Sequence, residues 1–279
     1  MITITCNSVK FDYKTFTFPG GEVGFKFNMQ QYALWLWAKE GAKVTITARV
    51  HTGEHFMLLA MIKNALESNG ATNIELVLPY VSYGRQDRIC DAGEAFSLKV
   101  YANLLNSLNF KSVKIYDPHS EATALLINNV QVITQLGIIQ SFDAFAKRIL
   151  KGVTFVAPDA GGNKKTAAIA SYFGHGDYVR ADKLRDLTNG NIKETIVYCD
   201  DLNGADVVIV DDICDGGRTF VELAKALKKK NAGKIILYVT HGIFSKGVDV
   251  LFNDGIDEIY TTNSYNEVYD PRVVVFRNV

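Results

Sequence analysis

The sequence predicts an α/β fold built from mostly parallel sheets with helices on their faces. Short apolar runs alternate with amphipathic stretches of helical spacing through most of the 279 residues. This alternation is typical of strand–helix–strand units, in which crossover helices join parallel strands. Polar, glycine-bearing segments follow several of the apolar runs. In open sheets of this kind, ligands bind at the carboxyl ends of the strands.

In the first half, apolar runs predict strands and amphipathic stretches predict helices. The N-terminal residues alternate apolar and polar side chains, as a half-buried strand does. Further strands are expected at 44–50, 74–81 and 113–116, and helices at 55–67 and 97–108.

The same alternation returns in the second half. Strands are expected at 153–157, 207–210, 235–240 and 273–276, and helices at 164–173 and 220–229. Because the two halves share this plan, we expect two similar domains, residues 1–142 and 143–279.

The composition excludes several classes of partner. Lysine and arginine total 30, and so do aspartate and glutamate, so no net charge draws the chain onto nucleic acid or anionic lipid. The four cysteines lie far apart, which argues against a zinc site or a disulfide framework. No signal peptide is recognisable, and no apolar run approaches the ~20 residues that span a bilayer. We therefore expect a cytoplasmic protein with no nucleic-acid or membrane partner.

The stretch VVIVDDICDGGRT carries the strongest chemical signal. Asp211 and Asp212 follow an apolar strand, where carboxylates accept hydrogen bonds from sugar hydroxyls or hold Mg²⁺. Gly216 and Gly217 let backbone N–H groups approach a phosphate at the start of a helix. The alternative is that Asp215 caps this helix and the acid pair is merely solvated.

Three weaker polar clusters follow other predicted strands. VAPDAGGNKK (156–165) suits either a phosphate loop or an ordinary strand–helix connection. In YVSYGRQDR, Arg85 is suited to clamping phosphate, but exposed loop arginines usually do not. The lone His119 suits an interior position as well as a ligand position.

A polar stretch from 174 to 191 lies between predicted strands and carries Lys183 and Arg185. A long loop of this kind is able to close over an anionic substrate. The alternative is a solvated basic loop.

Together these segments resemble the ribose-phosphate diphosphokinases, the phosphoribosyl pyrophosphate synthetases. The motifs keep the family's order over almost the whole chain: FPGGE, PYVSYGRQDR, YDPHS, APDAGG, ADKLR, VVIVDDICDGGRT, VTHGIFS and TTNS. The resemblance implies two tandem type I phosphoribosyltransferase-like domains, each a mostly parallel sheet with flanking helices, and an active site between them. It also implies a Mg²⁺-dependent reaction in which the anomeric hydroxyl of a ribose 5-phosphate takes the β,γ-diphosphoryl group of ATP and AMP leaves.

The resemblance implies a role for each matching residue. The magnesium positions are His119 and Asp159, and the catalytic-loop cations are Lys183 and Arg185. The ATP-binding positions are Phe18, Glu22, Arg85, Gln86 and Asp87. The ribose- and phosphate-binding positions are Asp211, Asp212, Asp215, Gly216, Gly217, Arg218 and Thr219. Because Phe18 and Glu22 match adenine-binding positions that a neighbouring subunit supplies, a homo-oligomer, from dimer to hexamer, is implied.

The chain departs from the family in its phosphate loop. Where the family usually has D-T-x-G-T, this chain has DGGRT, so Gly216 replaces a threonine and Arg218 a glycine. Two acceptors remain open: ribose 5-phosphate, and a ribose carrying a 5-diphosphate, such as ADP-ribose, whose second phosphate Arg218 would bind. The chain resembles short phage members of the family that use ADP-ribose in NAD regeneration. Alternatively, Arg218 points to solvent or pairs with Glu222.

Two other function classes compete with the enzyme. A phosphoribosyltransferase would share VVIVDDICDGG but has no reason to carry the ATP motifs of the first half. A non-catalytic relative would tend to lose metal or catalytic-loop residues, whereas this chain keeps His119, Asp159, Lys183 and Arg185. The sequence therefore favours an ATP-dependent diphosphotransferase.

Overall fold

The computed structural model describes residues 2–142, 146, 152–174, 176–185 and 192–277. Its contacts divide the chain into two compact units, residues 1–133 and 134–279. The expected boundary between 142 and 143 therefore moves towards the N-terminus. Helix α5 (Gln135–Ser141) is part of the second unit, because the Gln135 side-chain amide donates a hydrogen bond of 2.6 Å to the carbonyl oxygen of Asp211.

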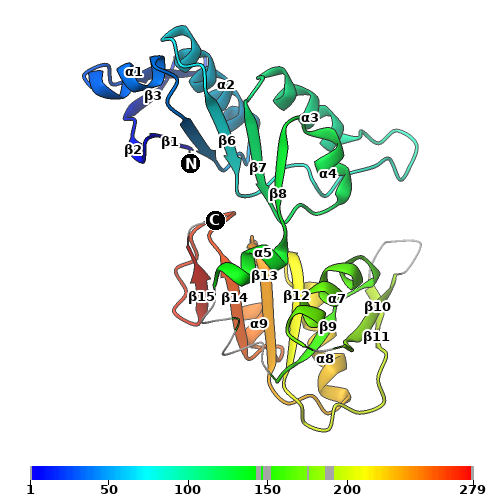
Figure 1. Ribbon diagram of the computed structural model, residues 1–279. Coiled ribbons are helices and arrows are strands. Elements are labelled where there is room, and N and C mark those ends of the chain that lie inside the picture. The colour runs from blue at the N-terminus through cyan, green and yellow to red at the C-terminus, as the bar shows by residue number, and fades with distance from the viewer. Residues whose placement is uncertain (1, 143–145, 147–151, 175, 186–191, 278–279) are drawn as a thin grey trace. The chain divides into compact units, whose positions relative to one another are not determined.

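A six-stranded sheet in the order β2-β1-β5-β6-β7-β8 forms the first unit (Figure 1). Strands β5 to β8 run parallel, whereas β1 is antiparallel to both of its neighbours. Strands β3 and β4 form a separate hairpin. The strands are β1 (Ile2–Cys6), β2 (Val9–Lys10), β3 (Tyr13–Thr17), β4 (Val23–Phe27), β5 (Val44–Ala48), β6 (Ile74–Leu78), β7 (Ser112–Tyr116) and β8 (Val130–Ile133). The helices are α1 (Tyr32–Lys39), α2 (Gly53–Ser68), α3 (Ser97–Ser107) and α4 (Glu121–Leu126).

The core of the first unit follows from period-2 patterning on the strands and from helices packed over them. Strands β1, β5 and β6 alternate buried and half-buried residues, as the sequence predicts. Helix α2 begins where the hydroxyl of Thr52 accepts a hydrogen bond of 3.2 Å from the backbone N–H of His55. Trp35 on α1 is buried in this core. No helix among the described residues is long and apolar enough to cross a membrane.

The second unit holds a seven-stranded sheet in the order β11-β10-β9-β12-β13-β14-β15. Every neighbouring pair is parallel except β10 and β11. The strands are β9 (Thr154–Ala157), β10 (Val179–Arg185), β11 (Ile192–Val197), β12 (Val207–Cys214), β13 (Ile235–Gly242), β14 (Glu258–Thr262) and β15 (Val273–Phe276). Besides α5, the helices are α7 (Asn163–Tyr172), α8 (Arg218–Lys229) and α9 (Asp249–Phe252), with a 3₁₀ turn at Ala160–Gly162.

Strand β12 is buried on both faces, which explains its unbroken apolar run. Val207 and Ile209 pack with residues of α8, whereas Val208 and Val210 pack with residues of α5 and α7. In Figure 1 these helices lie on opposite faces of the sheet. A parallel strand covered in this way reads as continuous hydrophobic sequence rather than as an alternation.

Two expectations about this unit were wrong. Strand β12 continues to Cys214, so Asp211 and Asp212 lie inside the strand rather than after it. The expected loop from 174 to 191 contains strand β10, which pairs with β9 and β11; residues 186–191 lie outside the described residues. Polar residues dominate β10, so its sequence lacks the apolar alternation that identifies a strand.

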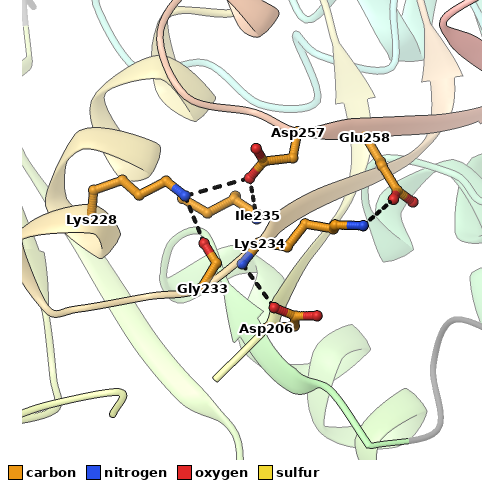
Figure 2. A network of polar contacts seen from close by, with 7 residues as sticks. All are labelled: Asp206, Lys228, Gly233, Lys234, Ile235, Asp257 and Glu258. Atoms are coloured by element: carbon orange, nitrogen blue, oxygen red, sulfur yellow. Dashed lines mark hydrogen bonds and ion pairs between the residues drawn. The ribbon is translucent and has the colours of Figure 1, made fainter. Parts of the chain in front are cut away.

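A polar network holds the amino-terminal ends of β12, β13 and β14 (Figure 2). The carboxylate of Asp206 accepts a hydrogen bond of 2.8 Å from the backbone N–H of Lys234, and that of Asp257 accepts one of 2.7 Å from Ile235. Gly233 lies in the turn before β13, and its carbonyl accepts a 2.6 Å bond from the ammonium of Lys228. The network therefore lies at the amino-terminal edge of the sheet. The polar clusters at 156–165 and 211–219 lie towards the opposite, carboxyl-terminal edge.

Gly233→Ala is expected to destabilise the protein. A Cβ at this position would lie 2.4 Å from the carbonyl oxygen of Gly204 and 2.7 Å from Oδ1 of Asp206, so backbone must move. Strain of this kind costs about 1–3 kcal/mol of unfolding free energy. Thermal and urea unfolding measure it. Gly176→Ala is the control, because a Cβ there meets nothing within 4 Å; an equal loss in both variants would contradict the account.

Candidate functional site

The two adjacent carboxylates of β12 lie at the carboxyl-terminal end of the second unit's sheet. Asp211 is half-buried and Asp212 is buried. The backbone N–H of Asp212 donates a hydrogen bond of 2.9 Å to Oδ1 of Asp211, which fixes the orientation of that carboxylate. The Lys165 ammonium on α7 lies 3.6 Å from the Asp212 carboxylate and partly offsets its charge.

Burial raises the pKa of Asp211 well above its ordinary value, and the neighbouring Asp212 carboxylate adds to the shift. The charge of Asp159 acts in the same direction. The pair therefore binds protons, hydroxyl hydrogens or cations more readily than isolated surface carboxylates do. This is the electrostatic character expected of a sugar- or metal-binding site.

Asp159 and Lys183 form a close ion pair in the same unit. Asp159 follows β9, and its Oδ1 accepts a hydrogen bond of 3.1 Å from the backbone N–H of Gly162. Its Oδ2 accepts a hydrogen bond of 2.7 Å from the Lys183 ammonium on β10. Burial acts to raise the pKa of Asp159, but Lys183 and the backbone N–H groups outweigh it and the pKa is lowered. The Lys183 side chain is only 9% exposed, whereas the side chain of Arg185 lies outside the described residues.

The glycine loop after β12 leads directly into helix α8. Gly217 adopts φ +77°, a left-handed conformation that favours glycine, and a Cβ there would approach Leu251 to 3.0 Å. The N-cap position of the helix is Gly217, which has no side chain to cap it; Asp215, two residues earlier, is half-buried. Arg218 is the exposed first residue of α8, and Thr219 is half-buried behind it. The N–H groups at the start of a helix favour an anion.

Lys246 is a residue that sequence reasoning missed. It lies on the loop after β13, exposed, with its side chain beside Gly216. The sequence offered a signal only in the motif VTHGIFS, which ends immediately before this lysine.

In the first unit, the turn at 83–88 lies beside the segment that follows β7. The Arg88 guanidinium donates two hydrogen bonds, of 2.8 and 3.0 Å, to the Asp87 carboxylate. Together with a hydrogen bond from Ser120, this holds the pKa of Asp87 at about 2 despite partial burial. Arg85 and Gln86 are exposed, and the Gln86 side chain accepts a hydrogen bond from the Ser97 hydroxyl.

His119 is exposed, so its interpretation as an interior histidine is wrong. The charge of His119 helps to lower the pKa of Asp87, so His119 belongs to the same cluster as Asp87 and Arg88. Phe18 and Glu22 lie apart from this cluster, at the tip of the β3–β4 hairpin. There Phe18 is 49% exposed, with its ring 5.1 Å from that of Phe16.

No group of three or more His, Cys, Asp or Glu side chains gathers as a metal site within the described ranges. This arrangement still fits Mg²⁺, which is commonly held by one or two carboxylates together with substrate phosphates and water. The acid pair of β12 and the half-exposed carboxylate of Asp159 supply oxygen ligands of that kind.

Comparisons with known proteins identify a family for both halves of the chain. A family model described as the N-terminal domain of ribose phosphate pyrophosphokinase matches residues 14–108, and one described as the phosphoribosyl transferase domain matches residues 131–270. The chain is 32% identical to the ribose-phosphate pyrophosphokinase of Vibrio parahaemolyticus, covering 76% of this chain and 68% of that protein. It is also 32% identical to that of Sulfolobus acidocaldarius, covering 76% and 72%.

The chain spans about two thirds of the length of the curated relatives that it matches; for the ribose-phosphate pyrophosphokinase of Thermosipho africanus the share is 66%. Its fold is that of the phosphoribosylpyrophosphate synthetase from Mycobacterium smegmatis, with a TM-score of 0.81 at 20% identity, over 98% of this chain and 88% of that one.

Asp212→Asn is expected to lower the pKa of Asp211, because it removes the adjacent negative charge. The folded protein holds the Asp211 proton more tightly than the unfolded chain does. The free energy of unfolding therefore falls as the pH rises from the ordinary carboxyl pKa to the raised one, and the variant loses less. Carbon-13 NMR titration of the carboxyl groups measures the shift. The exposed Asp177→Asn is the control; equal Asp211 pKa values in all three proteins would refute the coupling.

Proposed function

The chain belongs to the ribose-phosphate pyrophosphokinase family of enzymes, and on that premise we propose that it transfers the diphosphoryl group of Mg-ATP to the anomeric hydroxyl of a ribose 5-phosphate group. A bond forms between O1 of the ribose and the β-phosphorus of ATP. The bond between that phosphorus and the bridging oxygen of the α-phosphate breaks, and this oxygen leaves with AMP. The hydroxyl proton is released.

The acid pair followed at once by the glycine loop is the observation that supports this proposal most strongly. Asp211 and Asp212 would accept hydrogen bonds from the 2- and 3-hydroxyls of the ribose. Asp215, Gly216, Gly217 and Thr219 would surround its 5-phosphate, which the N–H groups at the start of α8 attract. Since β12 runs without interruption into this loop, one rigid segment would hold both ends of the sugar.

Two cations would act on the transferring phosphates. Lys183, held by Asp159 at 2.7 Å, would neutralise charge on the non-bridging oxygens, and Arg185, on the same strand, would do so as well. Reactions of this type depend on positioning and charge neutralisation rather than on covalent catalysis.

Asp159 of the second unit and His119 of the first are the two positions that would serve as Mg²⁺ ligands, each together with phosphate oxygens. When bound, the ion would supply positive charge to the β- and γ-phosphates. The half-exposed carboxylate of Asp159 accepts a hydrogen bond from the Lys183 ammonium through its Oδ2. The ion held by Asp159 and the ammonium of Lys183 would therefore act on the same phosphate group.

The first unit would bind ATP. Arg85 and Gln86, exposed on the turn beside His119, would contact the nucleotide, and Asp87 would orient Arg88 through their paired hydrogen bonds. Phe18 and Glu22, at the hairpin tip, would serve the adenine of a neighbouring subunit's ATP in a homo-oligomer.

ADP-ribose is a second candidate acceptor, which would connect the enzyme with NAD regeneration. The observation in its favour is the altered loop, in which the exposed Arg218 adds a guanidinium at the start of α8. A lone 5-phosphate is already surrounded by N–H groups and does not need the guanidinium. The second phosphate of a 5-diphosphate would give the guanidinium a bidentate partner.

AMP formation from Mg-ATP, with ribose 5-phosphate and ADP-ribose offered in parallel, tests the proposal. Phosphorus-31 NMR identifies the products. AMP together with a new diphosphate on C1 of either sugar supports the reaction, and the active sugar identifies the acceptor. Hydrolysis of ATP without a sugar-linked diphosphate would overturn the proposal.

Lys183→Met is expected to lower kcat by about 100- to 1,000-fold, the usual effect of removing one transition-state donor. The substitution keeps the methylene stem, so folding is checked by thermal unfolding and kcat by AMP release. Lys229→Met, on the exposed end of α8, is the matched control. Turnover near the wild-type value would remove Lys183 from the catalytic assignment.

Arg218→Gly restores the family's usual residue and is expected to shift preference towards ribose 5-phosphate. If the guanidinium binds a second phosphate, the ratio of kcat/KM for ADP-ribose over ribose 5-phosphate falls by about 10-fold or more. Parallel assays on both sugars measure the ratio. An unchanged ratio would show that Arg218 does not read the acceptor.

A further inference from the structure

The loop after β13 is fixed against the glycine loop by backbone hydrogen bonds. The N–H groups of Ile243 and Phe244 donate to the carbonyl oxygen of Cys214, at 2.9 and 3.0 Å, and that of Ser245 donates to Asp215 at 3.2 Å. Gly247 closes the turn with a 2.8 Å bond to Phe244. The backbone on either side of Lys246 is therefore tied to the two residues that precede Gly216.

The stem of Lys246 occupies the space into which a side chain at position 216 would project. A Cβ on Gly216 would lie 3.6 Å from both Cδ and Cε of Lys246 and 3.9 Å from its Cγ. These are ordinary van der Waals distances for the first atom, but a branched side chain would extend further and displace the stem. Glycine at 216 thus allows the lysine to lie over the loop.

The Lys246 ammonium is available to a ligand. The residue is exposed, and within the described part of the chain no hydrogen bond or ion pair holds the ammonium. The nearby acid Asp249 is 2.6 Å from the guanidinium of Arg272. Arg218, the first residue of α8, supplies a second exposed cation of the same loop.

We propose that Lys246 determines acceptor specificity by binding a phosphate beyond the 5-phosphate, so that the acceptor is a ribose carrying a 5-diphosphate ester. The inference rests on the proposed function and names a residue through which that site selects its acceptor. A single 5-phosphate has the glycine-loop and helix N–H groups as partners, whereas a second phosphate needs donors that reach past the loop. The flexible stems of Lys246 and Arg218 provide such donors.

Lys246→Met separates charge from packing, because methionine keeps an apolar stem over Gly216. We expect kcat/KM for ADP-ribose to fall by about 10-fold or more relative to kcat/KM for ribose 5-phosphate, as for a lost hydrogen bond to a charged group. Lys246→Arg is expected to keep the wild-type ratio. Gly216→Thr, which displaces the stem, is expected to lower the ratio as Lys246→Met does, and Lys229→Met is the control.

Calorimetric titration of each protein with ADP-ribose and with ribose 5-phosphate, without ATP, tests the same claim independently of turnover. Weaker binding of ADP-ribose alone in Lys246→Met supports the inference. Equal losses for both sugars would mean that Lys246 binds the shared 5-phosphate, and no loss for either would mean that the stem only packs; both results overturn it.

The failure of this inference is distinguishable from failure of the proposed function. A wild-type protein that forms AMP with ribose 5-phosphate but does not bind ADP-ribose would overturn the inference alone. A protein that forms AMP with neither sugar would overturn the proposed reaction, and the binding titrations would then decide the role of Lys246 by themselves.

Discussion

Two consecutive carboxylates inside a buried strand, towards its carboxyl-terminal end, constrain the rest of the second unit. Burial raises the pKa of Asp211, and the neighbouring Asp212 carboxylate raises it further. Such a pair is costly unless a ligand, a cation or a nearby ammonium offsets it. The Lys165 ammonium lies 3.6 Å from the Asp212 carboxylate, and the Lys183 ammonium donates a hydrogen bond to the carboxylate of Asp159. The site therefore gathers carboxylates and ammonium groups before any substrate binds, and is suited to hydroxyl donors and to cations.

The sheet holds this charge in place. Strand β12 lies between β9 and β13 and is covered on both faces, so the backbone that carries the acids has little freedom to move them apart. The same strands lead into the segments that bear Asp159, the glycine loop and Lys246. Gln135, from a helix far away in the chain, adds a hydrogen bond to the Asp211 carbonyl. Rigid support of this kind is what positioning a sugar and a phosphate requires.

The periodicity of apolar residues, and the polar residues that follow predicted strands, predicted much of the fold. The strand at 273–276 has the expected bounds, and the sequence identified Asp159, Asp211 and Asp212 as neighbours of one sheet edge. Strand β10 was missed because its polar residues carry no apolar alternation. Helix α5 contacts the second unit through residues far apart in the sequence, for example through hydrogen bonds from Gln135 to Asp211 and Thr240. The sequence did not identify Lys246 as a site residue, because only the folded structure shows that its side chain lies beside Gly216. These features depend on tertiary contacts, which local pattern does not encode.

The central claim is that the acid pair binds the ribose hydroxyls. Calorimetric titration of the wild type and of Asp211→Asn with ribose 5-phosphate and 2-deoxyribose 5-phosphate tests it most directly. We expect the wild type to bind the deoxy sugar about 10-fold more weakly or worse, and the variant largely to lose this discrimination, because the carboxyl group that pairs with the hydroxyl is gone. Equal discrimination by both proteins would contradict the claim and separate the acid pair from the sugar.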